Sequence, residues 1–469
     1  MLIYNQYPIN KKNIVKNTIF FYFLTIIILV VFSLQSFSQY SVNPYIQKII
    51  VQNYGFENNN YSIIQDKNKI IYIGNSNGIL QYNGNTWKQL DVNGIPIMDI
   101  DMEGVIYVGL DNDFGYIENK GTKPVYISIS DSLKNQQYPF GQINQVFCHP
   151  QGVYFCSDNY LFGYNQSGIF VLKESKSKLK LFKVNDHIYL QIFGEGFFKL
   201  IANQIRMMPQ SSYFDDKTII DILPYHERLL IKTKENRGFL IFDNYSVESF
   251  ETKADQFIET NIYTKSCQLN NGDYAIGTQL YGIIIINQQG EIINHIEETS
   301  GLYNLTINSL FIDLDDNLWA LHDQGISRIE IHSAFSYYSK NHGLRGNIKT
   351  LIRFNNKIYV GTSLGIFFMD FSEKENCLKC SRFIPLQDIK SNCHKFHIFN
   401  NQLFAITSLG IYEIKDNKAT LFYNRDADEI CSVLHSPSKP QYVYLGLKNG
   451  LMAIRYSSGM LIVEKKLES

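Results

Sequence analysis

The sequence lacks any sign of a helical fold beyond its N-terminus. After residue 34, the 469-residue chain contains no long stretch with apolar residues at the 3.6-residue spacing of a helix, and no second hydrophobic span. It also lacks an excess of charge, because 43 lysine and arginine residues stand against 44 aspartate and glutamate residues. This balance does not suggest nucleic acid or an anionic membrane surface as a partner.

Catalytic signatures are lacking as well. The sequence has no Gly-x-Ser-x-Gly nucleophile elbow and no Ser, His and Asp at the spacing of a hydrolase triad. Its histidines are scattered along the chain rather than grouped, for example His187, His226, His322 and His342. We therefore predict no catalytic residue and no cofactor, and we expect that the chain is not an enzyme.

What the sequence contains instead is a short unit of strands, seen most clearly in residues 62–90. Polar turns at 66–69 and 75–78 separate three short runs rich in β-branched and aromatic residues, which favour strands. Asn83-Gly84 then gives a strong hairpin signal, because both residues tolerate positive φ. Four short antiparallel strands of this kind form one propeller blade.

The unit recurs about ten times. A glycine before the third strand returns every 36 to 45 residues, if Asn159-Tyr160 fills one position, at Gly78, Gly115, Gly196, Gly238, Gly282, Gly325, Gly365, Gly410 and Gly450. Propeller blades repeat at roughly 40–45 residues, rather than at the roughly 33–34 residues of some helical repeats. The sequence therefore predicts an all-β fold with blades at about 61–92, 96–130, 142–173, 179–211, 218–252, 260–298, 305–340, 348–386, 392–423 and 430–466.

Ten blades exceed the usual four to eight of one ring. The simplest division is a seven-bladed propeller at 39–344, then about three blades of a second, incomplete propeller at 345–469. Tyr45–Val51, a strand without a hairpin partner, is predicted to be the outer strand of a later blade. Three blades cannot close a ring, so the chain is a fragment, or another molecule completes the ring, or a ten-bladed ring forms. We favour the fragment.

The N-terminus has the features of a secretory signal peptide. Lys11, Lys12 and Lys16 precede the apolar run Ile19–Phe32, and Ser36-Phe37-Ser38 offers small residues for cleavage. We predict a signal peptide at 1–38 and a periplasmic location; the alternative is an uncleaved membrane anchor. Cleavage would remove three lysines and no acidic residue, leaving 40 basic and 44 acidic residues.

Seven cysteines are an odd number for an exported chain. Cys148 and Cys156 lie on neighbouring predicted strands in an unknown register, and Cys377 and Cys380 could close a small disulfide loop. Buried free thiols are the expectation for the remaining three, which are Cys267, Cys393 and Cys431.

One group of residues has a loosely zinc-like spacing, formed by Cys377, Cys380, Cys393, His394 and His397. We predict no metal site, because Cys393 and His397 should lie on one face of a strand and His394 on the other. Asp313–Asn317 does not fit a calcium loop either, since Leu318 and Gln324 stand where glycine and glutamate are needed. It is interpreted as a hairpin turn, and 426–429 as a solvated loop between blades.

Two segments, 62–87 and 310–326, closely resemble the two-component-regulator propeller repeat. Residues 43–45 and 54–55 resemble the segment that leads into such propellers, so the resemblance covers about 43–469. Blade seven departs from the repeat, with Ala320-Leu321 where blade eight has Gly361-Thr362. Tyr72, Tyr107, Trp87 and Trp319 recur at blade positions, so packing explains them without a ligand.

The resemblance implies the periplasmic sensor half of a hybrid two-component system or of a related membrane-bound transcriptional regulator. In that plan two stacked seven-bladed propellers precede an immunoglobulin-like domain, a membrane helix and a cytoplasmic kinase or DNA-binding output. This sequence departs from the plan by stopping within the second propeller. No phospho-acceptor histidine segment, nucleotide-binding glycine box or helix-turn-helix is visible, so the output domains are missing.

The predicted function is therefore an extracytoplasmic ligand-sensing propeller without catalysis of its own. The resemblance implies a glycan-derived ligand at the propeller face or between domains, and a homodimer through the sensor region. The sequence does not indicate which residues contact the ligand. Two alternatives stay open: an exported propeller enzyme, such as a lyase or hydrolase acting at the axial funnel, and a non-catalytic interaction scaffold.

Overall fold

The computed structural model describes residues 43–468, except 52–54, 56, 58, 121–122, 135–138, 324, 334, 371–381, 388, 400, 425–429, 437, 440 and 458–459. Three predicted features lie outside the described residues: the signal peptide, the Cys377–Cys380 pair and the 426–429 loop. In the part of the chain that is described, none of the helices has the length and apolar character needed to cross a membrane.

The described residues form ten four-stranded antiparallel sheets, each of which is one blade. Blades one to three are β2–β5 (Asn60–Gln65, Ile71–Asn75, Gly78–Tyr82, Trp87–Leu90), β6–β9 (Ile97–Ile100, Ile106–Gly109, Phe114–Lys120, Lys123–Ser128) and β10–β13 (Gln145–His149, Gly152–Cys156, Tyr160–Asn165, Gly168–Glu174). Blades four to six are β14–β17 (Leu179–Val184, His187–Ile192, Gly196–Ile201, Gln204–Met207), β18–β21 (Ile219–Tyr225, Arg228–Thr233, Phe239–Phe242, Val247–Phe250) and β22–β25 (Tyr263–Gln268, Tyr274–Thr278, Ile283–Ile286, Ile292–Ile296).

Blade seven combines β26–β28 (Ser309–Ile312, Leu318–His322, Gly325–Ile329) with β1 (Ile46–Ile49). Blades eight to ten are β29–β32 (Ile348–Phe354, Lys357–Thr362, Gly365–Asp370, Ile384–Pro385), β33–β36 (Cys393–Phe399, Gln402–Thr407, Gly410–Lys415, Lys418–Asn424) and β37–β40 (Ile430–His435, Tyr442–Leu447, Gly450–Ser457, Met460–Glu468). The described helices are short: α2 (Asp131–Lys134), α3 (Asp255–Asn261), η2 (Ser211–Phe214), η3 (Glu298–Ser300) and η4 (Lys340–His342).

The predicted repeat is confirmed strand by strand. Each third strand begins at, or within one residue of, the glycine or Asn159-Tyr160 turn that defined the repeat. Gly78 shows why glycine is needed there: its φ is +115°, and a Cβ at this position would lie 2.6 Å from the Leu90 carbonyl oxygen. A side chain would therefore clash with the outer strand of its own blade.

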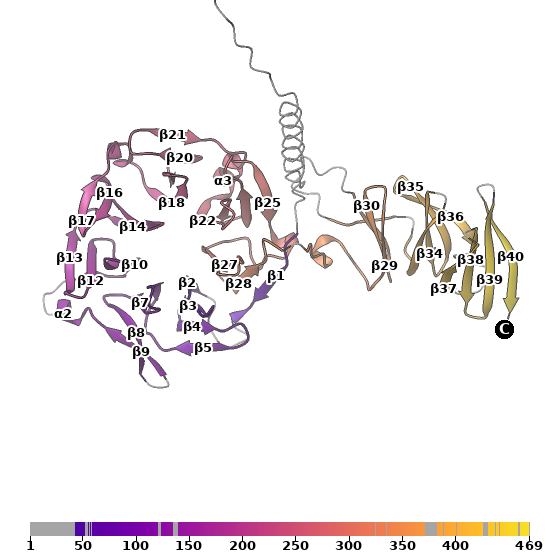
Figure 1. The fold of residues 1–469 in the computed structure, drawn as a ribbon, viewed down its shortest axis with the longest axis horizontal. Coiled ribbons are helices and arrows are strands. Elements are labelled where there is room, and N and C mark those ends of the chain that lie inside the picture. Colours follow the sequence, from indigo (N-terminus) through magenta and orange to yellow (C-terminus); the bar gives the residue numbers. More distant parts are fainter. Residues whose placement is uncertain are drawn as a thin grey trace, which may run out of the picture. The chain divides into compact units, whose positions relative to one another are not determined.

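Blades one to seven close into a ring. The first strand of each blade contacts the first strand of the next, from β2 through β6, β10, β14, β18 and β22 to β26, and β26 contacts β2 again. β1 adds to the outer edge of blade seven by pairing antiparallel with β28, Ile46 opposite Ile329 and Ile49 opposite Ile326 (Figure 1). The prediction that the first strand belongs to a later blade is confirmed. The boundaries 39–344 and 345–469 stay predictions.

The core lies between neighbouring blades rather than at a single centre, as expected for stacked sheets. Where the ring closes, Trp319 and Leu321 of blade seven pack with Ile73 and Leu80 of blade one. The same kind of layer joins blade eight to blade nine and blade nine to blade ten.

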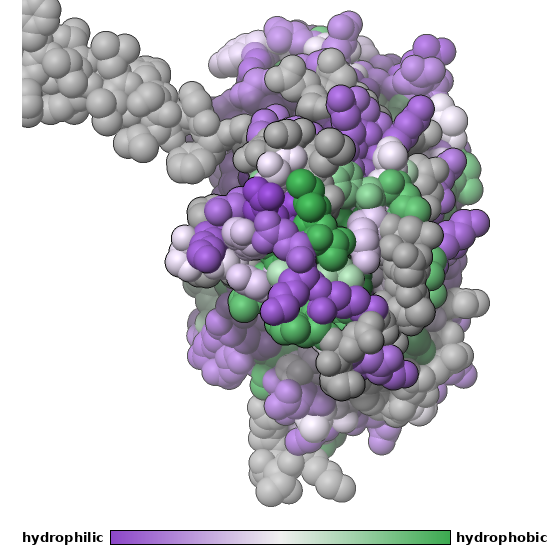
Figure 2. Space-filling view, turned by 90° about the vertical axis from the view of Figure 1, so that its right-hand side faces the viewer, coloured by the Kyte–Doolittle hydropathy of each residue, from purple (hydrophilic) through white to green (hydrophobic). Residues whose placement is uncertain are grey.

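One face of blade ten has no neighbouring blade among the described residues. The positions that pack onto the next blade, Ile366 in blade eight and Ile411 in blade nine, are 1% and 3% exposed, whereas the matching Leu451 in blade ten is 42% exposed. Figure 2 views the molecule from the side on which Figure 1 draws blade ten, and apolar residues gather there. This face has the chemistry of an interface between blades.

The structure corrects three details of the sequence interpretation. Cys393 and His397 do not share a face, because the register shifts between Cys393 and Lys395: Cys393 packs towards blade eight and His397 lies opposite Phe404. Cys431 is exposed rather than buried. The pair Leu321-His322, rather than Ala320-Leu321, occupies the place of Gly361-Thr362, since His322 pairs with Gly325 as Thr362 pairs with Gly365.

The other described cysteines can be compared with the predictions one by one. Cys148, Cys156 and Cys393 are buried free thiols, and Cys267 is a half-buried one. Cys148 lies opposite Val153, so the two cysteines on β10 and β11 are out of register for a disulfide.

Candidate functional site

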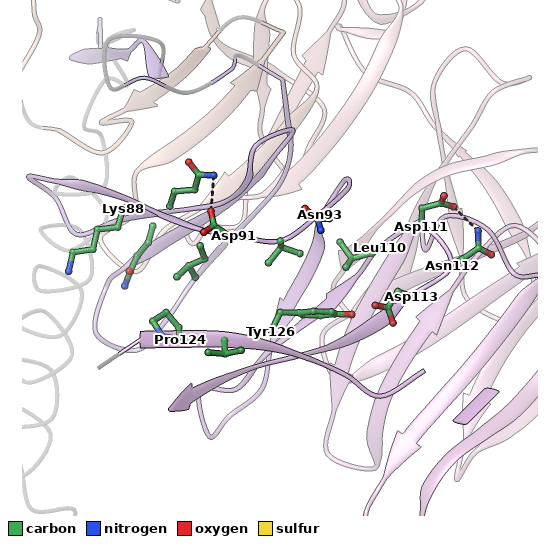
Figure 3. Close-up of a pocket in the computed structure, with 14 residues that line it drawn as sticks. Lys88, Asp91, Asn93, Leu110, Asp111, Asn112, Asp113, Pro124 and Tyr126 are labelled. Carbon is green, nitrogen blue, oxygen red and sulfur yellow. Dashed lines mark hydrogen bonds between the residues drawn. The ribbon is translucent and has the colours of Figure 1, made fainter. Parts of the chain in front are cut away.

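A groove of about 950 Å³ lies between blades one and two (Figure 3). Blade one supplies β5 and the loop at 91–93, and blade two supplies the turn at 110–113 and part of β9. The groove is large enough for a small organic ligand, because binding pockets commonly measure ≈ 300–1,000 Å³.

The floor of the groove is apolar. Val92 and Leu110 are buried, and Leu90 and Tyr126 pack against the same cluster that joins the two blades. In Figure 3 the Tyr126 ring lies below Leu110, and its hydroxyl end points towards Asp113. A ligand would therefore meet an aromatic surface with polar groups around it.

The rim is polar, with three aspartates, four side-chain amides and one lysine: Asp91, Asp111, Asp113, Gln81, Gln89, Asn93, Asn112 and Lys88. Gln89 Nε2 donates to the Asn77 carbonyl oxygen at 2.8 Å and to Asp91 Oδ1 at 3.2 Å. Asn112 Nδ2 donates to Asp111 Oδ1 at 3.2 Å. Each of these two carboxylates therefore accepts a hydrogen bond from a side-chain amide at the groove.

Asp113 is the rim carboxylate with the most hydrogen-bond donors around it. Its Oδ1 accepts from the Phe114 backbone N–H at 2.9 Å, from Ser128 Oγ at 2.6 Å and from Ser130 Oγ at 2.5 Å. Burial, together with the negative charge of Asp113, raises the pKa of Tyr126. The Tyr126 phenol therefore stays neutral and keeps its proton.

This arrangement suits a neutral, hydroxyl-rich ligand better than a charged one. Carboxylates and amides together accept from and donate to hydroxyl groups, and an aromatic face packs against the C–H face of a ring. With three carboxylates and a single lysine in the lining, an anionic ligand would be repelled.

The inner strands of the ring carry charged groups that bond to one another. Lys183 Nζ lies 3.3 Å from Asp99 Oδ2 and so joins blade four to blade two, and Lys265 Nζ lies 2.7 Å from Asp221 Oδ1. Lys180 Nζ donates to the Ile220 carbonyl oxygen at 2.8 Å, and burial lowers the pKa of Lys180 to about 8. These groups link the inner strands of different blades at the axis, and the Lys183–Asp99 pair does so across blade three.

The residues weighed from sequence as candidate sites do not come together. His187, His226, His322 and His342 lie on different elements, and the described residues include no group of three His, Cys, Asp or Glu side chains placed to hold a metal ion. Asp313–Asn317 is a hairpin turn, as predicted: Asp313 Oδ1 accepts from the backbone N–H groups of Asp315 and Asn317 at 2.9 and 2.8 Å.

The groove itself was missed by sequence reasoning. Residues 111–113 have only the polar character of a turn, and the outer strands β5 and β9 carry no motif. The groove forms where two separate blades meet, and a pattern within one blade gives no information on which side chains of the next blade will face it.

The ten four-stranded antiparallel sheets define a protein of the β-propeller class. No family model and no curated protein matches the sequence. Among solved structures, the chain is similar to the extracellular domain of a protein described as a hybrid two-component system of B. thetaiotaomicron, with 15% identity, a TM-score of 0.63, and coverage of 90% of this chain and 60% of that one.

Two further solved structures are similar at lower scores. One is the extracellular domain of a one-component system of B. thetaiotaomicron, with 15% identity, a TM-score of 0.47, and 90% and 61% of the two chains covered. The other is virginiamycin B lyase from Staphylococcus aureus, with 11% identity, a TM-score of 0.47, and 61% and 99% covered.

The first similarity confirms the predicted all-β propeller fold. It also comes from the class of protein that the repeat resembles, the extracellular part of a two-component regulator. The chain spans about 60% of the length of that domain.

Proposed function

We propose that this chain is an extracytoplasmic, ligand-sensing β-propeller module of a two-component or transcriptional regulator, without catalysis of its own. The observation that carries the proposal is the similarity of 90% of the chain, at a TM-score of 0.63, to the extracellular domain of such a system. The N-terminal basic and apolar segments support export to the periplasm.

The proposed ligand is a glycan-derived small molecule, and the proposed site is the groove between blades one and two. Its support is chemical: hydrogen-bonded carboxylates and amides surround an aromatic floor. In this proposal the ligand contacts two neighbouring blades. Its binding is transmitted as a signal by rearrangement of the domains. A homodimer through the sensor region belongs to the same proposal.

A thermal-shift screen of the purified chain against oligosaccharides tests ligand and site together. A ligand that binds only the folded state raises apparent stability, by about 2.7 kcal/mol at a concentration one hundred times its Kd. We expect one class of neutral oligosaccharide to raise the midpoint. Failure of every neutral sugar to do so would refute the glycan proposal.

Variants then locate the site. Asp111→Asn keeps the oxygen that accepts from Asn112 but removes the charge, and Asn93→Ala removes an exposed amide at the rim. We expect both to lower the ligand-induced shift by about 1 kcal/mol or more, and to leave the ligand-free midpoint within about 0.5 kcal/mol. Gln289→Ala, which removes an exposed amide in a turn of blade six, is the matched control and should keep the full shift.

The same screen separates the sensor from the alternative of a propeller enzyme. Chromatography of each stabilising sugar after prolonged incubation with the chain should return it unchanged. Conversion of the sugar would favour the lyase or hydrolase alternative instead.

A further inference from the structure

Three exposed apolar side chains stand together on blade six and the helix that leads into it. Ile262 follows α3, and Leu280 and Tyr281 form the tip of the turn between β23 and β24. Their exposed fractions are 50%, 52% and 46%. The two loops touch, because the Gln279 backbone N–H donates to the carbonyl oxygens of Asn261 at 3.2 Å and Ile262 at 3.0 Å. We call Ile262, Leu280 and Tyr281 the apolar crest.

Ile262 is held in a conformation that isoleucine avoids. Its φ is +58° and its ψ is +103°. Among the fifteen non-glycine residues with positive φ in the described part of the chain, Ile262 is the sole β-branched one. Positive φ brings the branched Cβ against the backbone, so glycine or asparagine would be less strained. An exposed side chain gains little burial in return, so the fold alone gives no reason for isoleucine here.

The turn that carries Leu280 and Tyr281 is rigidly supported. The Gly282 backbone N–H donates to the Leu305 carbonyl oxygen at 3.0 Å, and Thr306 Oγ1 donates to the Gln279 carbonyl oxygen at 2.9 Å. Behind the turn, the His295 ring stacks on Tyr281 with 5.8 Å between ring centroids. The apolar crest is therefore ordered before any partner arrives, which lowers the entropy lost on binding.

Phe257 adds a second aromatic support. Its ring meets Tyr281 edge to face at 5.9 Å and His295 at 5.1 Å. Aromatic side chains with few rotatable bonds are enriched among residues that dominate binding energy.

The surroundings of the apolar crest are acidic. The segments that build it, 255–262, 279–282 and 295–301, contain four carboxylates and neither lysine nor arginine. Glu259, one helical turn before Ile262, pairs with Arg237 at 3.0 Å, so its charge is already matched. On the other side, Glu297 and Glu298 follow β25, and the Glu297 backbone lies against Gly282.

We propose that the apolar crest docks a cationic protein segment that carries an aliphatic or aromatic anchor residue. The anchor would pack on Ile262, Leu280 and Tyr281, while its lysine or arginine neighbours meet Glu297 and Glu298. Complementary charge around an apolar centre is the usual anatomy of a specific interface. This interaction surface is separate from the groove between blades one and two, and it does not depend on the sensor proposal.

The test measures binding of three synthetic decapeptides to the whole chain by fluorescence anisotropy. One alternates lysine with phenylalanine, the second replaces lysine by glutamate, and the third replaces phenylalanine by serine. We expect the first alone to bind, and to bind at least tenfold more weakly when salt is raised from 50 to 500 mM, since exposed charges are then screened.

Two variants examine the apolar crest itself. Ile262→Gly removes the anchor contact and also relieves the strained backbone, so we expect at least tenfold weaker binding without a fall in the thermal midpoint. Leu280→Ser should weaken binding similarly. Leu314→Ser, which alters a 62% exposed leucine in a turn of blade seven, is the control and should bind as the unaltered chain does.

Two results would overturn the proposal. Equal binding of the lysine–phenylalanine peptide by the Ile262→Gly and unaltered chains would show that the peptide binds elsewhere. A dimer in sedimentation velocity that disperses in Ile262→Gly would show that a second copy of the chain, rather than a cationic segment, covers the apolar crest.

Discussion

Several blades end their second strand with a side chain that hydrogen-bonds the following turn. Thr362 Oγ1 and Thr407 Oγ1 accept from the backbone N–H groups of Leu364 and Leu409, each at 3.1 Å. Asn75 Oδ1 accepts from the Asn77 N–H at 2.9 Å in blade one. Short polar side chains stabilise such turns by replacing a backbone acceptor. The position therefore favours threonine or asparagine for a local reason.

Blade seven uses His322 at this position and gains a titratable group. The ring is fully buried, with Nδ1 2.9 Å from the Thr306 carbonyl oxygen and Nε2 2.9 Å from Ser327 Oγ. Burial lowers the pKa of His322 to about 4 from an ordinary value of 6.5. The neutral ring is therefore the form that fits the fold.

This burial predicts acid sensitivity centred on blade seven. Between pH 6.5 and about 4 the unfolded chain binds a proton at His322 and the folded chain does not, so stability is lost as pH falls through that window. The loss amounts to roughly 3 kcal/mol at its lower end. His322→Thr, which places the residue of blades eight and nine at this site, should remove that part of the pH dependence. Urea unfolding at pH 7.5 and pH 4.5 measures the difference, and parallel losses in both chains would contradict it.

At the scale of the element, equivalent positions in successive blades have different surroundings. Ile411 of β35 is 3% exposed because blade ten covers it, and Leu451 of β39 is 42% exposed. Tyr359 and Phe404, at one position in blades eight and nine, are each 4% exposed, and Tyr444 of blade ten is half-buried. The repeat specifies an apolar residue whether or not a neighbour is present.

The free energy lost on truncating an apolar side chain should depend on whether a neighbouring blade covers it, rather than on its position in the repeat. We expect Ile411→Ala to cost about 2–4 kcal/mol, because it leaves a cavity between two blades, and Leu451→Ala to cost less than about 1 kcal/mol. Urea unfolding of the two variants measures both values. Equal costs would mean that something covers blade ten in solution.

Particular elements show how far the sequence could predict the structure. The turn glycines, such as Gly78 and Gly325, fixed the start of the third strands to within one residue, because positive φ or close approach of the backbone leaves few alternatives. The face of the strand on which His397 lies could not be predicted. One extra residue at the Cys393–Lys395 bulge moves every following side chain to the opposite face of the sheet. The groove at Asp111 and Tyr126 depends on packing between blades, for which a single blade carries no pattern.

At the scale of the whole molecule, the ring depends on contacts between the two ends of about 280 residues of chain. β1 pairs with β28, Lys69 pairs with Asp315, and the Leu314 backbone N–H donates to Gln65 Oε1 at 2.6 Å. Such long-range contacts are costly in loop entropy and form late. The closing interface between blades seven and one is therefore the place where the ring should open first.

Both tryptophans of the chain lie at this closing interface, so their fluorescence reports on it. Tyr82 stacks on Trp87 at 4.6 Å and meets Trp319 at 6.2 Å.

Ile49→Ala should weaken the closing interface selectively. Ile49 is 5% exposed and packs with Trp319 in the core that joins the two blades. We expect a loss of about 2–4 kcal/mol, with the tryptophan transition in urea preceding the loss of strand signal in circular dichroism. Ile276→Ala, in the core between blades five and six, removes a side chain of the same size away from the closing interface. There the two signals should change together, as in a cooperative transition. Coincident transitions in Ile49→Ala would mean that the ring unfolds as one unit and that its closing strand is no weaker than its other joints.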